Sequence, residues 1–165
     1  MDDTTLDKDA LLRQVMAQVE EGLRRLGSGY AVAKQATLDS PHVMKSKREV
    51  TGIESSYLAN ALAGTIQERE FCLRTLGRFR MPKAPQRAAL GCLVGIGPAD
   101  GPVERLYFIL PVCGGMEIPV VPGARMVRVV TPETPVAKAL MGRSVGDEVE
   151  LRKGGTLPEV VRLLF

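Results

Sequence analysis

The stretch TPETPVAKALMGRSVGDEVEL, residues 131–151, constrains the fold most, because it orders a helix, a turn and a strand within one short segment. Two threonines are suited to cap a helix, and two prolines fit its first turn. An apolar stripe on one face follows, and Gly142 ends the helix. Val145-Gly146-Asp147 favours a turn, after which residues 148–151 alternate polar and apolar like a half-buried strand. With residues 126–130 also typical of a strand, the predicted order is strand, short helix, turn, strand.

The same stretch resembles the C-terminal domain of the Gre transcript cleavage factors. In that family the pattern S/T-P-x-S-P-[IVL]-[AG]-x-A-L-[IL]-G-x-x-V-G-D-x-V precedes the last strands, and residues 131–149 follow it closely. The resemblance implies an FKBP-like α+β sheet behind an N-terminal antiparallel coiled coil, which in the family enters the secondary channel of bacterial RNA polymerase. It also implies candidate polymerase-docking positions, which are Thr131, Pro132, Pro135, Gly142, Gly146 and Asp147.

Residues 12–37 keep one heptad register, which is typical of a coiled-coil seam. One core position holds Leu12, Val19, Leu26 and Ala33, and the other holds Met16, Leu23, Tyr30 and Thr37. The register continues through Gly27-Ser28-Gly29, although each glycine costs about 1 kcal/mol relative to alanine inside a helix. We therefore predict one continuous helix that is locally less stable at these glycines.

A second helix is predicted from about Ile53 to Arg80, and its buried face holds Leu58, Leu62, Ile66, Leu73 and Leu76. Pro41 ends the first helix, and the charged, aperiodic residues 42–52 are typical of a solvated loop. Two helices of similar length joined by a short polar tip predict an antiparallel hairpin. This N-terminal coiled-coil hairpin is expected to occupy residues 1–80, with its tip at about 39–54.

Two prolines in Met81-Pro82-Lys83-Ala84-Pro85 mark a shift in composition, where we place a domain boundary. Beyond it the pattern predicts five strands, at Ala89–Ile96, Val103–Val112, Met126–Val130, Asp147–Leu151 and Glu159–Leu164. Five strands and one helix make a small domain over residues 86–165. The expected fold class of the whole chain is α+β.

Composition limits the classes of partner that the chain is expected to bind. The 22 basic and 19 acidic residues give a net charge of +3 at pH 7, too mild to predict non-specific nucleic-acid binding, so contact with backtracked RNA is expected to be indirect. The sequence lacks a run near the ~18 apolar residues of a membrane span, and its first residues are too acidic for a signal peptide. We therefore expect a cytoplasmic location and no membrane partner.

The residues offer little for catalysis. Cys72, Cys92 and Cys113 are odd in number and lack a CxxC pair, so neither a disulfide framework nor a zinc site is indicated. His42 is the single histidine and suits a surface position better than a catalytic base. Glycines at 91–97 lack the spacing of a nucleotide-binding loop. We expect no catalytic residue of its own, no metal in isolation, no cofactor and no small-molecule substrate.

The Gre resemblance implies that acids at the tip help the polymerase hold a second Mg²⁺ and a water, so that the polymerase cleaves its own backtracked RNA. The family pattern there is close to [DE]-x-x-E-Y, and Glu54 falls on its glutamate. Thr51 stands at the first acid, which leaves Glu49 and Asp39 as substitutes in shifted positions. The plainer alternative is that Glu54 is a first-turn acid stabilised by the helix dipole.

Residues 48–58 also resemble a shorter group of Gre-like proteins with a D-T-R-x-x-E-A-S-Y-L type of tip. Three functional hypotheses follow. The first is a transcription elongation factor that binds bacterial RNA polymerase and, as an accessory factor rather than an enzyme, stimulates cleavage of backtracked RNA. The second is an inhibitor that binds the same channel without cleavage activity. The third is a coiled-coil protein-interaction module unrelated to transcription.

Overall fold

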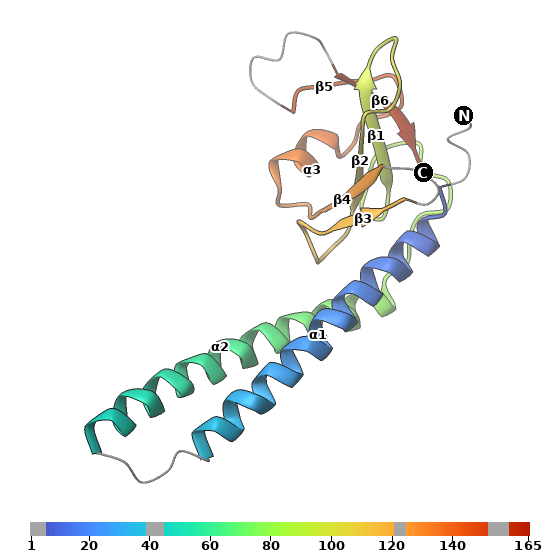
Figure 1. Ribbon diagram of the computed structural model, residues 1–165. Helices are drawn as coiled ribbons and strands as arrows, with labels where there is room; N and C mark the ends of the chain where they lie inside the picture. Colours follow the sequence, from blue (N-terminus) through green and yellow to red (C-terminus); the bar gives the residue numbers. More distant parts are fainter. Residues whose placement is uncertain (1–5, 39–44, 121–124, 152–158) are drawn as a thin grey trace. The chain divides into compact units, whose positions relative to one another are not determined.

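The computed structural model describes residues 6–38, 45–120, 125–151 and 159–165 (Figure 1). Two long helices, α1 (Lys8–Leu38) and α2 (Lys45–Arg78), precede a mixed sheet that carries one short helix, α3 (Pro135–Leu140). These elements confirm the predicted α+β class. The backbone forms two compact units, one of Met1–Val15 with Thr75–Phe165 and the other of Met16–Arg74. The predicted boundary at residues 81–85 stays a prediction.

Helix α1 begins where Asp7 can satisfy its first amides. The Asp7 carboxylate accepts a hydrogen bond from the Asp9 amide at 2.9 Å, as N-terminal caps do. The helix runs unbroken through Gly27-Ser28-Gly29, as the sequence predicts. Its first turns belong to the unit that contains the sheet, and there Leu11 and Val15 are buried while Leu12 is half-buried. Packing in that unit therefore selects a face beside the predicted heptad seam.

Helix α2 begins at Lys45 rather than near Ile53, so the predicted loop over residues 42–52 is wrong from Lys45 onward. The cause is local: Lys, Arg and Glu are good helix formers, and a solvated charge cluster is as compatible with an exposed helix as with a loop. Leu58, expected on the buried face, is 53% exposed. In the part of the chain that the structure describes, neither long helix is apolar enough to cross a membrane.

The two long helices approach each other closely at one described point of the second unit. A Cβ atom added to Gly22 of α1 would lie 2.6 Å from Nη1 of Arg69 in α2. The Arg69 guanidinium therefore packs against the glycine backbone, and its Nε is buried without a hydrogen-bond partner. Gly22 permits an approach that a larger residue there would oppose.

The sheet has the strand order β3-β4-β2-β1-β6-β5. The strands are β1 (Leu93–Pro98), β2 (Arg105–Ile109), β3 (Glu117–Pro119), β4 (Met126–Val130), β5 (Glu148–Val149) and β6 (Glu159–Leu164). Among these described strands β2 and β4 pair in parallel and the other neighbours pair antiparallel. The bounds of β4 and β6 match the prediction, and β3 was missed.

One face of the sheet packs against α3. Ala137 and Leu140 of α3 join a buried cluster with residues of five strands, which are represented by Val94, Tyr107, Val130, Val149 and Val161. Because side chains alternate along a strand, Leu93, Leu106 and Phe108 fall on the opposite face, and all three are buried. The sheet is therefore covered on both sides over its centre.

The segment that joins α2 to β1 is fixed to its surroundings. Lys8 donates a 2.6 Å hydrogen bond to the Pro82 carbonyl, and partial burial lowers the pKa of Lys8. Phe79 and Pro82 lie against Gly91, whose φ is +85°. At its end, Ala88 is buried; its amide donates to the Arg143 carbonyl and its carbonyl accepts from the Gly142 amide, each at 2.7 Å.

Candidate functional site

The motif segment folds as the sequence predicts at its helix. The Thr134 hydroxyl accepts a hydrogen bond from the Ala137 amide at 3.3 Å and donates one to the Thr131 carbonyl at 2.8 Å. Pro135 occupies the first turn, where its missing N–H costs nothing. Thr134, rather than Thr131, is therefore the cap of α3.

Gly142 and the turn after it hold the end of the motif in one conformation. Gly142 and Gly146 have φ values of +82° and +92°, which L side chains adopt only with strain. The Asp147 carboxylate accepts from the Ser144 amide at 2.8 Å. The Gly146 amide donates to the Val161 carbonyl at 2.8 Å, which ties the turn to β6. These motif residues therefore have a structural role that accounts for their presence.

The candidate docking residues differ in exposure. Pro135, Gly142, Gly146 and Asp147 are exposed, whereas Thr131 and Pro132 are half-buried. Between the exposed ones lie two exposed apolar side chains, Met141 at 40% and Val145 at 59%. These two were not among the predicted docking residues, although both fall on apolar positions of the Gre-like pattern.

Replacing Thr134 by alanine should lower the free energy of unfolding by about 1 kcal/mol, because the first turn of α3 loses its side-chain cap. Thr134→Ser keeps a hydroxyl at the same place and should cost only a few tenths of a kcal/mol. Urea unfolding followed by circular dichroism measures both values. Equal losses for the two variants would show that the methyl group, and not the hydroxyl, matters.

The predicted tip acids are only partly placed. Glu49 and Glu54 lie within α2, where the structure describes the backbone and not these side chains, and Asp39 lies outside the described residues. Helical geometry turns the backbone by about 140° over five residues, so the two positions lie on different sides of the helix. The helical spacing alone therefore does not favour a carboxylate pair.

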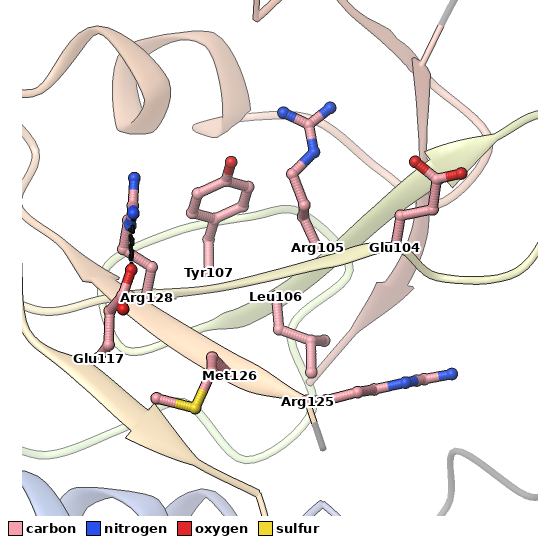
Figure 2. A pocket seen from close by; sticks show the side chains of 8 residues that line it. All are labelled: Glu104, Arg105, Leu106, Tyr107, Glu117, Arg125, Met126 and Arg128. Atoms are coloured by element: carbon pink, nitrogen blue, oxygen red, sulfur yellow. Dashed lines mark hydrogen bonds and ion pairs between the residues drawn. The ribbon is translucent and has the colours of Figure 1, made fainter. Parts of the chain in front are cut away.

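A second candidate site is an open groove of about 450 Å³ on β2, β3 and β4 (Figure 2). It is lined by Glu104, Arg105, Leu106, Tyr107, Glu117, Arg125, Met126 and Arg128. Figure 2 shows the side chains of Arg105 and Tyr107 projecting to one side of β2, next to the pair formed by Glu117 and Arg128. In contrast to the motif segment, this groove holds ionisable groups close together.

The charges of the groove are largely compensated. Arg128 donates to Glu117 through Nη2 at 2.6 Å and through Nε at 3.1 Å, and this bond raises the pKa of the Arg128 guanidinium. Arg105 forms an ion pair with Glu159. Because each of these arginines already has a carboxylate partner, the groove offers little net attraction for an anion, and we assign it no ligand.

Comparisons with known proteins give a limited result. No protein-family model matches the chain, and no curated protein matches it. The chain is similar to the crystal structure of GreA factor homolog 1 (Gfh1) of Thermus thermophilus, at 17% identity and a TM-score of 0.34, over 93% of this chain and 94% of that one. It is similar to Thermus aquaticus Gfh1 at 19% identity, with the same TM-score and 92% of each chain covered. At such values the likeness assigns no function.

Two features of the structure could not be predicted from the sequence. The compensated groove brings together β2, β3 and β4, and β3 was not predicted, so its Glu117 had no expected neighbour. The guanidinium of Arg69, with its buried Nε, faces Gly22, which is distant in sequence. Both depend on how separate segments meet, and single-segment patterns contain no signal for that.

Proposed function

We propose that this protein is a Gre-type transcription elongation factor that binds bacterial RNA polymerase in the cytoplasm. In this proposal α1 and α2 form a coiled-coil hairpin that enters the secondary channel. The C-terminal unit is FKBP-like and docks at the rim of that channel. The protein is not an enzyme and has no cofactor of its own; the Mg²⁺ and the RNA belong to the polymerase complex.

The observation that carries the proposal is the folding of residues 131–149. The residues of the Gre-like motif form a capped helix, a glycine-ended turn and a short strand in the expected order. Two long helices, of 31 and 34 residues, precede this motif as the hairpin requires. The motif and the long helices together support the family assignment more than either would alone.

The tip favours one version of this function. Thr51 stands where the family has an acid, and Glu49 and Glu54 sit on different sides of α2. Two metal ions need hard anionic ligands on the same side to stabilise the attacking and leaving oxygens. We therefore favour a channel-binding regulator that does not stimulate cleavage, with a cleavage factor as the second candidate.

Polymerase binding is tested by retention of core polymerase on the immobilised full-length protein at about 0.15 M salt, where long-range charge effects are screened. The wild type should retain polymerase, and the double variant Met141→Glu with Val145→Glu should retain at least about tenfold less, because charge at an interface core costs several kcal/mol. Met126→Glu is the matched control, since Met126 is exposed in the same unit. Absence of retention by the wild type would refute polymerase binding.

An assay of RNA cleavage in stalled, backtracked polymerase complexes distinguishes the regulator from the cleavage factor. A regulator without cleavage activity leaves the RNA intact with the wild type and with Glu54→Ala or Glu49→Ala. A cleavage factor shortens the RNA and loses that activity in either variant, while Glu68→Ala, an exposed position further along α2, keeps it. Shortening of the RNA by the wild type would overturn the version that we favour.

A further inference from the structure

The segment that joins α2 to β1 exposes a run of basic side chains. Arg78, Arg80, Lys83 and Arg87 are all exposed, and residues 75–90 contain no Asp or Glu. In the described ranges none of these four side chains forms a hydrogen bond or an ion pair. By contrast, Arg13, Arg24, Arg25 and Lys138 are exposed and each has a carboxylate partner. We call residues 78–87 the cationic strap.

The cationic strap has a defined backbone. Phe79, Met81, Pro82 and Pro85 are half-buried and lie between the exposed cations. Phe79 and Pro82 pack against Gly91, Lys8 bonds to the Pro82 carbonyl, and both backbone groups of Ala88 are hydrogen-bonded. Because the backbone is held before a ligand arrives, little of the binding free energy is lost in ordering it.

The net charge of the whole chain does not reveal the local charge of the cationic strap. Its four positive charges exceed the net charge of +3, so the remainder of the chain is slightly acidic. A whole-chain average therefore gives no sign of a local cluster, and the expectation that nucleic-acid contact is indirect rests on that average. Local charge, not net charge, sets the potential that a ligand meets at close range.

The chemistry of the cationic strap points to a phosphate backbone. Protein partners are usually anchored by aromatic or apolar side chains at the centre of an interface. Among the described residues, the large exposed apolar side chains all lie outside residues 75–90. Nucleic-acid backbones, in contrast, are bound mainly by Lys and Arg, and a guanidinium can hold a phosphate through two hydrogen bonds. A surface with cations and no apolar anchor fits this second class.

We propose that the cationic strap binds the phosphate backbone of a single-stranded nucleic acid without reading its bases. Such a strand is flexible enough to follow an irregular segment. Because the strap exposes no aromatic side chain for stacking, the expected contacts are with phosphates, which carry no sequence information. This proposal does not depend on polymerase binding, because the strap and its ligand meet without a third component.

The test is fluorescence anisotropy of the full-length protein with a labelled single-stranded RNA of about 20 nucleotides. If four phosphates are contacted, affinity should fall about 50-fold between 50 and 200 mM salt, from a slope of about −0.7 per contact. Combining Arg78→Gln, Arg80→Gln, Lys83→Gln and Arg87→Gln should weaken binding at 50 mM salt at least about tenfold and bring the slope close to zero. Polymerase is absent, so failure here is distinct from failure of the proposed function.

The control removes the same total charge elsewhere, through Arg13→Gln, Arg24→Gln, Arg25→Gln and Lys138→Gln, and should keep affinity within about threefold because those cations are already paired. Equal losses in both variants would overturn the proposal, and so would displacement of the RNA by polyglutamate as readily as by unlabelled RNA, which would indicate an acidic protein ligand. If the fourfold variant melts at a lower temperature than the wild type, the single variants Arg80→Gln and Lys83→Gln test the proposal instead. Each should reduce the magnitude of the salt slope by about 0.7.

Discussion

Replacing Leu140 by alanine is expected to lower the free energy of unfolding by about 3 kcal/mol, within the 2–5 kcal/mol typical of buried leucines. Leu140 is fully buried and joins α3 to the cluster on the sheet. Truncation leaves a cavity beneath a helix of six residues, in which Ala137 is the other buried side chain. Urea unfolding at 25 °C, followed by circular dichroism, measures the loss.

The matched control for Leu140 is Lys138→Ala on the same helix. Lys138 is exposed, and its ion pair with Glu133 is long, at 3.8 Å, so the change should stay within about 0.5 kcal/mol. Alanine has a helix propensity at least as high as that of leucine or lysine, so a similar loss in both variants would mean that the burial of Leu140 does not determine the stability of α3. That result would contradict the packing described for the cluster.

Replacing Gly97 by alanine is expected to cost about 3 kcal/mol or more. A Cβ atom at this position would lie 2.1 Å from the Pro102 carbonyl oxygen, and a backbone atom cannot turn aside as the end of a side chain can. Gly97 also pairs with Val160 near the centre of the sheet, so a shift of its backbone disturbs β6 as well. The same urea experiment, with the melting temperature as a second measure, tests this.

Gly27→Ala provides the opposite expectation. Gly27 lies inside α1 with open space where the Cβ would be placed, so alanine should add up to about 1 kcal/mol of stability through its helix propensity. A destabilised Gly27→Ala together with a tolerated Gly97→Ala would refute both assignments. The two substitutions are chemically identical, which leaves the local surroundings as the cause of any difference.

The sequence predicted the regular elements where one local signal was sufficient. Residues 126–130 and 159–164 are short, mostly apolar runs that contain valines, and both strands were found with their bounds. The cap, prolines and stripe of residues 131–140 predicted α3 for the same reason. Each of these signals arises from the residues of the element itself, so tertiary contacts were not needed to read it.

The errors occur where tertiary packing or an ambiguous signal decides. The strand Glu117–Pro119 has three residues and ends in proline, which is too short for alternation to be seen. The first strand begins at Leu93 rather than Ala89, since Gly91 has a positive φ that breaks the ladder. Leu11 and Val15 are buried because the sheet unit surrounds them, and a heptad pattern cannot indicate that.

The candidate site was predictable only in part. The motif positions from Thr131 to Asp147 follow from a recognisable pattern, but that pattern does not indicate that the side chains of Met141 and Val145 within it are exposed. The cationic strap was read as a boundary between domains, because its prolines dominate the local pattern. That its side chains form no ion pair among the described residues is a property of the folded surroundings.

The reciprocal pair of backbone bonds at Ala88 has one more consequence. Its amide and carbonyl engage Arg143 and Gly142 at 2.7 Å each, so neither bond breaks easily while the other holds. The segment before β1 therefore cannot move away at this point unless the C-terminal end of α3 is released as well. A force applied to the chain before β1 would therefore be transmitted through Ala88 to the turn at Ser144–Asp147, although these two regions are far apart in the sequence.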